Sequence, residues 1–149
     1  MQNELKIALI QSDLVWENPE QNRKHFSEKI KNISEPVDMI ILPEMFTTGF
    51  TMNVTDLAES MDGPTIKWMR KMAKNANACL TGSAIIEENG NYYNRMIFMR
   101  ADGTFQYYDK RHLFRLAKEH NYFKPGNKKC IVDLKAWKIN LNVCYDLRF

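Results

Sequence analysis

The stretch "DMIILPE", from Asp38 to Glu44, restricts the fold of this chain more than any other. Its central residues are all apolar and do not alternate with polar ones, which predicts a strand that is buried on both faces. Strands of this kind are typical of the middle of parallel sheets, whose two faces are both covered by other elements. We therefore expect a layered fold built on a sheet.

The segment before this strand predicts a strand and then a helix. "LKIALIQ" (Leu5 to Gln11) has the pattern of another buried strand. Asn18 can cap a helix, and Pro19 suits its first position, since proline has no N–H to leave unbonded there. The apolar face of that helix should consist of Phe26, Ile30 and Ile33.

A second helix and a hairpin are expected further along. Gly63-Pro64 opens the helix, whose apolar side is formed by Trp68, Met69, Met72, Ala73 and Ala76. "CLTGSAIIEE" and "YYNRMIFMR" then flank Asn89-Gly90-Asn91, a favourable turn for a β-hairpin. Later strands are expected in "TFQYYDK", "KCIVDL" and "WKINLNVCYD".

Strand, helix, strand, helix and then hairpins indicate a mixed sheet of the α/β or α+β class. The sequence predicts two long helices but about six or seven strands. Two helices can cover roughly one face of such a sheet. No helix follows the last expected strand. On these grounds we expect residues 1–149 to be part of a larger fold, without an internal domain boundary.

The amino-acid composition excludes several classes of protein for this chain. Hydrophobic residues make up 44% of the chain and charged residues 26%, which excludes a disordered chain. The longest apolar run is far too short to span a bilayer, and the first residues do not resemble a secretory signal, so no membrane partner is expected. A net charge of +3 with dispersed lysines and arginines gives nucleic acid little support as a partner.

The three cysteines, Cys79, Cys130 and Cys144, are far apart and form no C-x-x-C pair. This spacing predicts neither a disulfide framework nor a zinc site, and it favours a reducing, cytoplasmic location.

Three reactive side chains follow apolar strands. Glu44 comes after "MIIL" and Pro43, Lys110 ends the aromatic strand "YYDK", and Cys144 follows "LNV". In α/β sheets, ligand-binding and catalytic sites are usually located at the ends of strands. Taken singly, each residue has an ordinary structural explanation: a small buried cysteine, a loop carboxylate or helix cap, and a surface lysine.

Together the three residues suffice for acyl transfer without histidine. A cysteine is a strong nucleophile only as the thiolate, and its free pKa is about 8.5. A carboxylate in a partly desolvated pocket can take the thiol proton. The oxyanion formed on attack needs a cation or aimed N–H donors, which Lys110 and the backbone N–H of Tyr145 can supply.

"LPEMFTTGF", "YYDKRHLF" and "NLNVCYDLRF", in this order, resemble the three motifs of the nitrilase superfamily of carbon–nitrogen hydrolases. The omega-amidase-like branch is the most similar, and the resemblance covers essentially the whole chain. It implies an α-β-β-α sandwich, with Glu44 as general base, Lys110 as oxyanion stabiliser and Cys144 as nucleophile. It also implies that residues 1–149 are the N-terminal portion of a single carbon–nitrogen hydrolase domain that ends just after the nucleophile motif.

Two further residues match the family. Glu119 corresponds to a second glutamate that supports the triad, although a solvated helix residue would have the same sequence context. Asn94 corresponds to a strand asparagine near the site, more in keeping with a structural hydrogen bond than with catalysis.

The implied reaction is hydrolysis of a small ω-amide of a dicarboxylic or keto acid through a cysteine thioester, without metal or organic cofactor. Nitrile or N-carbamoyl hydrolysis by the same triad, and a non-catalytic fragment, are the alternatives. A homo-oligomer, a dimer, is implied for the complete protein. We further expect Arg115, with Arg111 and His112 near it, to bind a substrate carboxylate, against the alternative of surface charge on a short helix.

Overall fold

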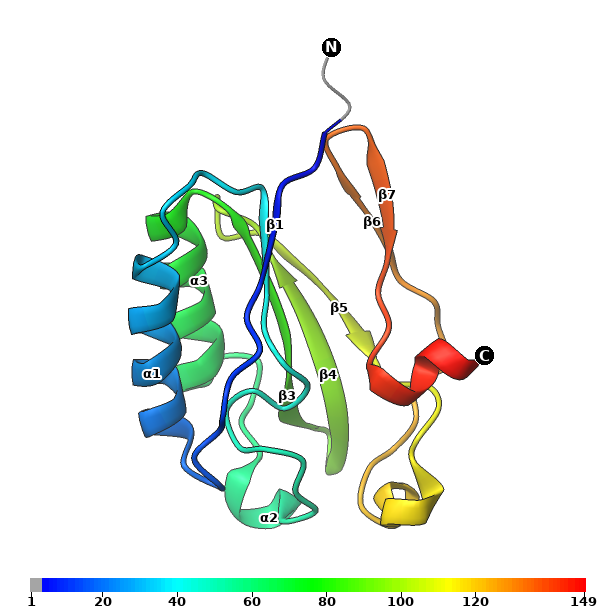
Figure 1. Cartoon of the computed structure of the whole chain (residues 1–149). Coiled ribbons are helices and arrows are strands. Elements are labelled where there is room, and N and C mark those ends of the chain that lie inside the picture. The colour runs from blue at the N-terminus through cyan, green and yellow to red at the C-terminus, as the bar shows by residue number, and fades with distance from the viewer. Residues whose placement is uncertain (1–3) are drawn as a thin grey trace.

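A five-stranded sheet separates two helices from a small β-hairpin in the computed structural model, which describes residues 4–149 (Figure 1). The strands lie in the order β1 (Ile7–Leu9), β2 (Met39–Ile41), β3 (Cys79–Glu88), β4 (Asn91–Met99) and β5 (Phe105–Asp109). The pairs β1–β2 and β2–β3 are parallel, whereas β3–β4 and β4–β5 are antiparallel. The expected mixed sheet is thereby confirmed.

The two long helices begin where the sequence predicts. In α1 (Pro19–Lys31), the side chain of Asn18 accepts a hydrogen bond from the N–H of Gln21 at 3.1 Å and caps the helix. Proline also occupies the first turn of α3 (Pro64–Ala76), which ends at Asn77 in the left-handed conformation. Both helices lie side by side on the same face of the sheet (Figure 1).

The hairpin of β3 and β4 is the longest strand pair. Asn89 and Gly90 both have positive φ, at 53° and 74°, which is the conformation that a two-residue hairpin turn of type I′ requires. Asn–Gly is the sequence that tolerates it best, because glycine has no Cβ and asparagine enters the left-handed region at little cost.

Each face of the sheet has its own apolar core. On the helical side, Ile97 and Met99 of β4 pack with α1 and α3 residues such as Phe26 and Met69. On the opposite side, Phe98 of β4 packs against a second sheet of β6 (Ile131–Leu134) and β7 (Trp137–Asn140). Since side chains alternate along a strand, even-numbered residues of β4 face this second sheet.

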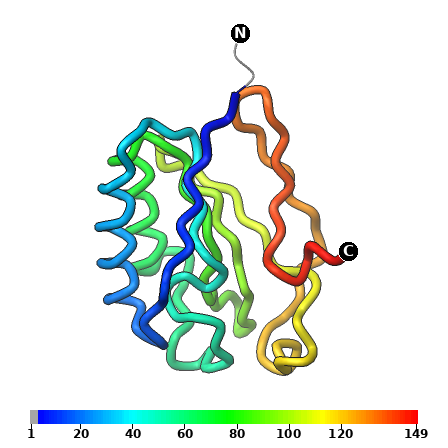
Figure 2. The backbone as a smooth tube through the Cα atoms, viewed as in Figure 1, coloured from blue at the N-terminus to red at the C-terminus, as the bar shows by residue number. Residues whose placement is uncertain are grey.

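The β6–β7 turn also reaches the start of β2. Lys135 Nζ lies 2.6 Å from Oδ1 of Asp38, at the end of the molecule where the orange hairpin of Figure 2 meets the blue N-terminal strand. The two sheets are thus joined by an ion pair at one end and by the apolar core between them.

Two expected strands differ from the structure. The strand expected over Leu5–Gln11 is confirmed only as the short β1, and it is not buried, because Leu9 is 74% exposed and Ile7 43% exposed. It is an edge strand whose inner residues, Ala8 and Ile10, pack on the helical core, while none of the described residues covers the other side. The strand expected over Trp137–Asp146 ends at Asn140, where its pairing with Ile131 of β6 ends, and the chain then turns at Cys144 into a short 3₁₀ helix, η3 (Cys144–Arg148).

Several short helices were not anticipated. They are α2 (Val54–Leu57), and η1 (Arg115–Ala117) and η2 (Glu119–Asn121), where the sequence offered a helix only as an alternative. Their lengths of one turn leave too little periodicity to detect in the sequence. Among residues 4–149, no helix has the length and apolar character needed to cross a membrane.

Candidate active site

Lys110 is the centre of a cluster of buried charges. Its Nζ lies 2.7 Å from Oε1 of Glu44 and 3.0 Å from Oε2 of Glu119. The lysine is 1% exposed and Glu119 0%, whereas the side chain of Glu44 is 19% exposed. The structure therefore brings three of the sequence-predicted residues into direct contact, with Glu44 on the solvent side.

The loop after β2 fixes Glu44. Met45 has a left-handed φ of 47°, and its N–H donates a 2.8 Å hydrogen bond to Oγ of the buried Ser83. The neighbouring Phe46 lies so close to Gly82 that a Cβ there would come within 2.8 Å of its ring. This tight fit against β3 holds the carboxylate on the face that the second sheet covers.

Lys110 follows β5 on the same face as Asn94 of β4. Its N–H donates to the carbonyl of Asn94 at 3.0 Å, so that the antiparallel pairing continues to the end of the strand. Burial by itself would lower the pKa of Lys110, but the carboxylates of Glu44 and Glu119 outweigh burial and raise that pKa above its usual value. The lysine is therefore a permanent cation of the site.

Glu119 is a buried member of the cluster, which excludes the alternative of a solvated helix residue. Its Oε2 also accepts the N–H of Phe114 at 2.6 Å, so the carboxylate closes the loop that begins after Lys110. This loop turns at Lys118, which has a left-handed φ of 58°.

Asn94 links the two carboxylates. Its Nδ2 donates to Oε1 of Glu44 at 2.9 Å and to Oε1 of Glu119 at 3.1 Å. The side chain is buried, and Oδ1 has no hydrogen-bond partner among the described residues. The contacts agree with the expected structural role for this asparagine.

Cys144 stands at the mouth of the cluster. It is exposed, in contrast to the buried Cys79 and the half-buried Cys130, and its φ of 44° lies in the left-handed region that a residue with a Cβ seldom adopts. Desolvation raises the pKa of this thiol, as do the charge of Glu44 and a hydrogen bond with it, while Lys110 acts in the opposite direction. The charge of Glu44 therefore favours the protonated thiol, and the charge of Lys110 favours the thiolate.

Asp146 was not singled out from the sequence, although its carboxylate holds the Cys144 turn in place. It is buried and accepts hydrogen bonds from the N–H of Val143, the hydroxyl of Tyr108 and both the backbone and the ring of His112. An aspartate two residues after the candidate nucleophile is the only sequence signal, and a turn-like Tyr-Asp gives it no distinctive pattern.

The three residues expected to bind a substrate carboxylate lie around another hollow. Arg111, His112 and Arg115 line a space of about 540 Å³ that is bounded on the other side by Tyr145 and Phe149. None of Glu44, Lys110, Glu119 and Cys144 lines it. Tyr145, the residue after Cys144, is the part of this lining that lies next to the candidate triad along the chain.

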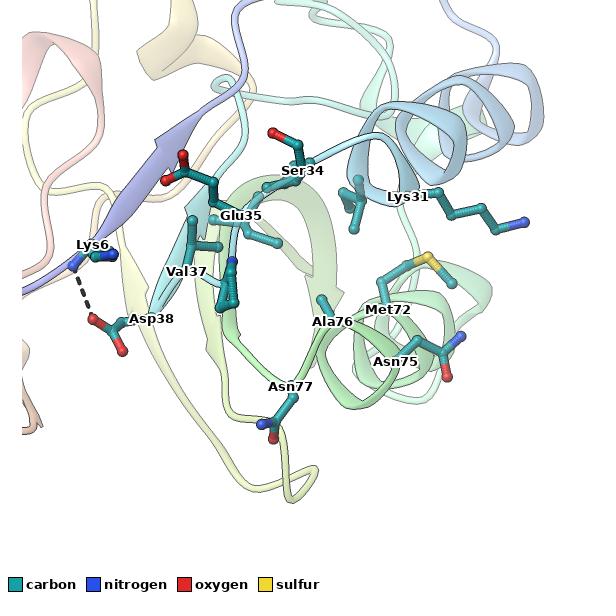
Figure 3. A pocket seen from close by; sticks show the side chains of 14 residues that line it. Lys6, Lys31, Ser34, Glu35, Val37, Asp38, Met72, Asn75, Ala76 and Asn77 are labelled. Carbon is teal, nitrogen blue, oxygen red and sulfur yellow. Dashed lines mark hydrogen bonds between the residues drawn. The ribbon is translucent and has the colours of Figure 1, made fainter.

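A larger hollow lies elsewhere, at the end of the helical layer. It measures about 880 Å³ and is lined by the C-terminal ends of α1 and α3 and by residues Ser34 to Asp38 (Figure 3). Its size does not make it the site, because the catalytic candidates lie at the other end of β2 and on the other face of the sheet. Within the described part of the chain, no group of three or more His, Cys, Asp or Glu side chains is placed to hold a metal ion.

Comparison with known proteins agrees with this arrangement. The carbon–nitrogen hydrolase family model matches residues 6–149. An omega-amidase of Escherichia coli is 41% identical over 97% of this chain and 56% of its own length. A 2-oxoglutaramate amidase of Bacillus subtilis is 32% identical over 96% of this chain and 56% of its own length.

A solved structure shows the same fold. A CN-hydrolase superfamily protein from Xanthomonas campestris, with an arsenic adduct in its active site, has a TM-score of 0.94 and 42% identity. The match covers 97% of this chain and 55% of that protein, so the chain spans about half the length of the relatives that it matches. From the buried Glu-Lys-Glu cluster, the exposed cysteine beside it and these matches, we conclude that the chain belongs to the carbon–nitrogen hydrolase family, that is, the nitrilase superfamily, and to its omega-amidase-like branch.

Proposed function

We propose that a protein containing this chain hydrolyses the amide bond of small ω-amides of dicarboxylic or keto acids, releasing the acid and ammonia. The observation that carries the proposal is the position of Glu44, which lies 2.7 Å from Lys110 and close enough to the exposed Cys144 for its charge to raise the pKa of that thiol. The proposed base Glu44, cation Lys110 and nucleophile Cys144 therefore lie together on the side of the cluster that faces solvent. The omega-amidase names of the relatives support the substrate class.

In the first half-reaction, Sγ of Cys144 attacks the amide carbon while Glu44 takes the thiol proton. A C–S bond forms, and the carbonyl oxygen becomes an oxyanion that Lys110 and the backbone N–H of Tyr145 stabilise. The intermediate collapses when Glu44 returns the proton to the leaving nitrogen. The C–N bond breaks, ammonia departs, and a thioester remains on Cys144.

In the second half-reaction, water attacks the thioester carbon and Glu44 takes a proton from it. A second oxyanion forms and collapses, the C–S bond breaks, and the thiol recovers its proton. The sum is one amide and one water converted to one acid and one ammonia. Thiol, carboxylate and oxyanion donors meet all the demands of these steps, so the proposed mechanism uses no cofactor.

Glu119 and Asn94 act behind the reacting groups. Glu119 keeps Lys110 charged and in place through its two contacts of 3.2 and 3.0 Å. Asn94 fixes the orientation of both carboxylates. Because buried partners such as these restrict the rotamers of the groups they touch, they keep the reacting atoms within the narrow tolerances that catalysis requires.

The experiment is an assay of ammonia release by the complete protein with a keto-acid ω-amide, a simple aliphatic amide, a nitrile and an N-carbamoyl amino acid. We expect turnover of the ω-amide, and none in the Cys144→Ala variant. A Cys130→Ser variant is the matched control, since Cys130 lies away from the cluster. Faster turnover of the nitrile or the N-carbamoyl compound would replace the proposed substrate class, and full activity of Cys144→Ala would refute the mechanism.

A cytoplasmic location and a homodimer also belong to this proposal. Fractionation of cells and the mass of the complete protein in solution test these two points separately from the reaction.

A further inference from the structure

The carboxylate of Asp146 connects two parts of the chain that carry different reacting groups. Its Oδ2 accepts the N–H of Val143 at 3.0 Å and the hydroxyl of Tyr108 at 2.8 Å. Its Oδ1 accepts the N–H of His112 at 2.9 Å and Nδ1 of the same histidine at 2.8 Å. With 1% of its side chain exposed, Asp146 has nearly all of its hydrogen-bonding capacity taken up by these donors.

The donors lie on both sides of Lys110 and directly before Cys144. Tyr108 precedes the lysine by two residues and His112 follows it by two, while Val143 is the residue before the cysteine. One buried carboxylate therefore fixes the segment that carries the cation relative to the turn that carries the nucleophile.

The Cys144 turn needs such a restraint. A cysteine with a φ of 44° is in a strained conformation that persists only where the surroundings enforce it. The N–H of Asp146 donates to the carbonyl of Val143 at 3.1 Å, so backbone and side chain of Asp146 both bind Val143. These two bonds bracket Cys144 and hold its backbone in the turn.

We propose that Asp146 is a positioning residue, which holds the thiol of Cys144 at its working distance from Glu44 and Lys110 by joining the Cys144 turn to the strand and loop around Lys110. This inference rests on the proposed function for its kinetic consequence. Asp146 acts through geometry, because it is not among the main groups whose charges shift the pKa of Cys144.

The test compares Asp146→Asn, Asp146→Ala and Tyr108→Phe in the complete protein. Asp146→Asn keeps one carbonyl acceptor but places an amide NH₂ donor where a carboxylate oxygen now accepts. Asp146→Ala removes all the hydrogen bonds of the carboxylate, and Tyr108→Phe removes only the bond from the tyrosine hydroxyl. We expect kcat to fall roughly 100-fold in Asp146→Ala, as a displacement of about 1 Å at the reacting centre would cause, and less in the other two. KM should change little. Asp133→Asn is the control, since its side chain is 71% exposed and far from the turn.

A second measurement separates positioning from plain stability. Iodoacetamide alkylation of Cys144 as a function of pH reports the surroundings of the thiol without needing turnover. If the thiol moves away from Glu44, its raised pKa should fall toward the free value near 8.5, so the alkylation profile of Asp146→Ala should shift to lower pH. Thermal unfolding and circular dichroism identify variants that do not fold. If Asp146→Ala does not fold, the kinetics and alkylation profiles of Asp146→Asn and Tyr108→Phe are compared with those of the wild type.

An unchanged kcat and an unchanged alkylation profile in a folded Asp146 variant would overturn the inference. So would a lower melting temperature with wild-type kcat below that temperature, because it would show a structural role alone. If the complete protein released no ammonia from any amide, the proposed function would fail, while the alkylation profiles would still decide whether Asp146 positions the thiol.

Discussion

Nζ of Lys110 lies 3.0 Å from Oε2 of Glu119, and neither side chain is more than 1% exposed. A buried carboxylate without its cation has lost its hydration and has no favourable ionic interaction to offset that loss. The pair therefore governs the stability of the site as well as its chemistry.

The first prediction follows from this pair. Lys110→Met should abolish ammonia release and lower the free energy of unfolding by about 3–5 kcal/mol, because it leaves Glu119 buried and unpaired. The urea midpoint of the complete protein measures the loss. In the double variant with Glu119→Gln, the free energy of unfolding should recover in large part, since no buried charge remains, while activity should stay absent. Equal urea midpoints for Lys110→Met and the double variant would contradict the assumed energetic coupling between the two residues.

A second prediction concerns the proton on Cys144. Desolvation raises the pKa of the thiol, as do the charge of Glu44 and a hydrogen bond with it, and Lys110 lowers it. Glu44→Gln removes the negative charge and leaves the positive one, so the thiolate should form at lower pH than in the wild type. Iodoacetamide should then label Cys144 faster at neutral pH, although the variant releases no ammonia because the base is missing. Slower labelling of Glu44→Gln would mean that Glu44 promotes ionisation in the resting state, contrary to the contacts described here.

Arg95 provides a third prediction, on the face of β4 opposite Asn94. It is 1% exposed, makes two hydrogen bonds with Asp109 at 2.7 and 3.0 Å, and stacks 4.0 Å from the centroid of the Tyr107 ring. Arg95→Met should cost about 3–5 kcal/mol of unfolding free energy, because Asp109 loses its partner. Arg95→Lys should recover only part of this unfolding free energy. An ammonium group lacks the planar guanidinium fork that bonds two carboxylate oxygens and stacks on the Tyr107 ring. Chemical denaturation of both variants provides the comparison, and identical midpoints would refute the role of the fork.

Much of the fold and the site could be predicted because each depends on local sequence. Apolar segments lead directly to the candidate residues Glu44, Lys110 and Cys144, and the Asn89-Gly90 turn sets the register of the longest hairpin.

What could not be predicted depends on tertiary contacts. The burial of a strand depends on what covers it, so the apolar pattern around Leu9 predicted burial where the edge of the sheet leaves it 74% exposed. The last strand ends early because its pairing with β6 stops at Ile131 opposite Asn140, and the chain then turns at Cys144, whose left-handed conformation is held by surrounding hydrogen bonds. Asp146 was missed for the same reason, since its donors come from Tyr108 and His112, far away along the chain.

The fourth prediction concerns substrate recognition. Arg115 is exposed and lines the hollow beside Tyr145, where a guanidinium can bind the distant carboxylate of an acidic amide through two parallel hydrogen bonds. Arg115→Ala should raise KM for acidic ω-amides and leave KM for uncharged amides and kcat nearly unchanged, which is the pattern of lost ground-state binding. Lys128→Ala, an exposed lysine at a different hollow, is the control. A similar rise in KM for charged and uncharged amides would exclude a carboxylate contact and leave Arg115 as surface charge.

The last prediction concerns residues 1–149 expressed by themselves. Leu9 projects from the edge strand with 74% exposure, and exposed apolar edges of this kind favour association. We expect this span to associate in solution, and light scattering measures its mass. Leu9→Lys should shift the mass toward the monomer, whereas Leu116→Lys, at a leucine that is 87% exposed but lies away from the sheet, should not. We also expect no ammonia release, because Cys144 is exposed and a site open to water weakens the electrostatic contacts that the reaction requires. A stable monomer with turnover close to that of the complete protein would show instead that these residues form a working domain by themselves.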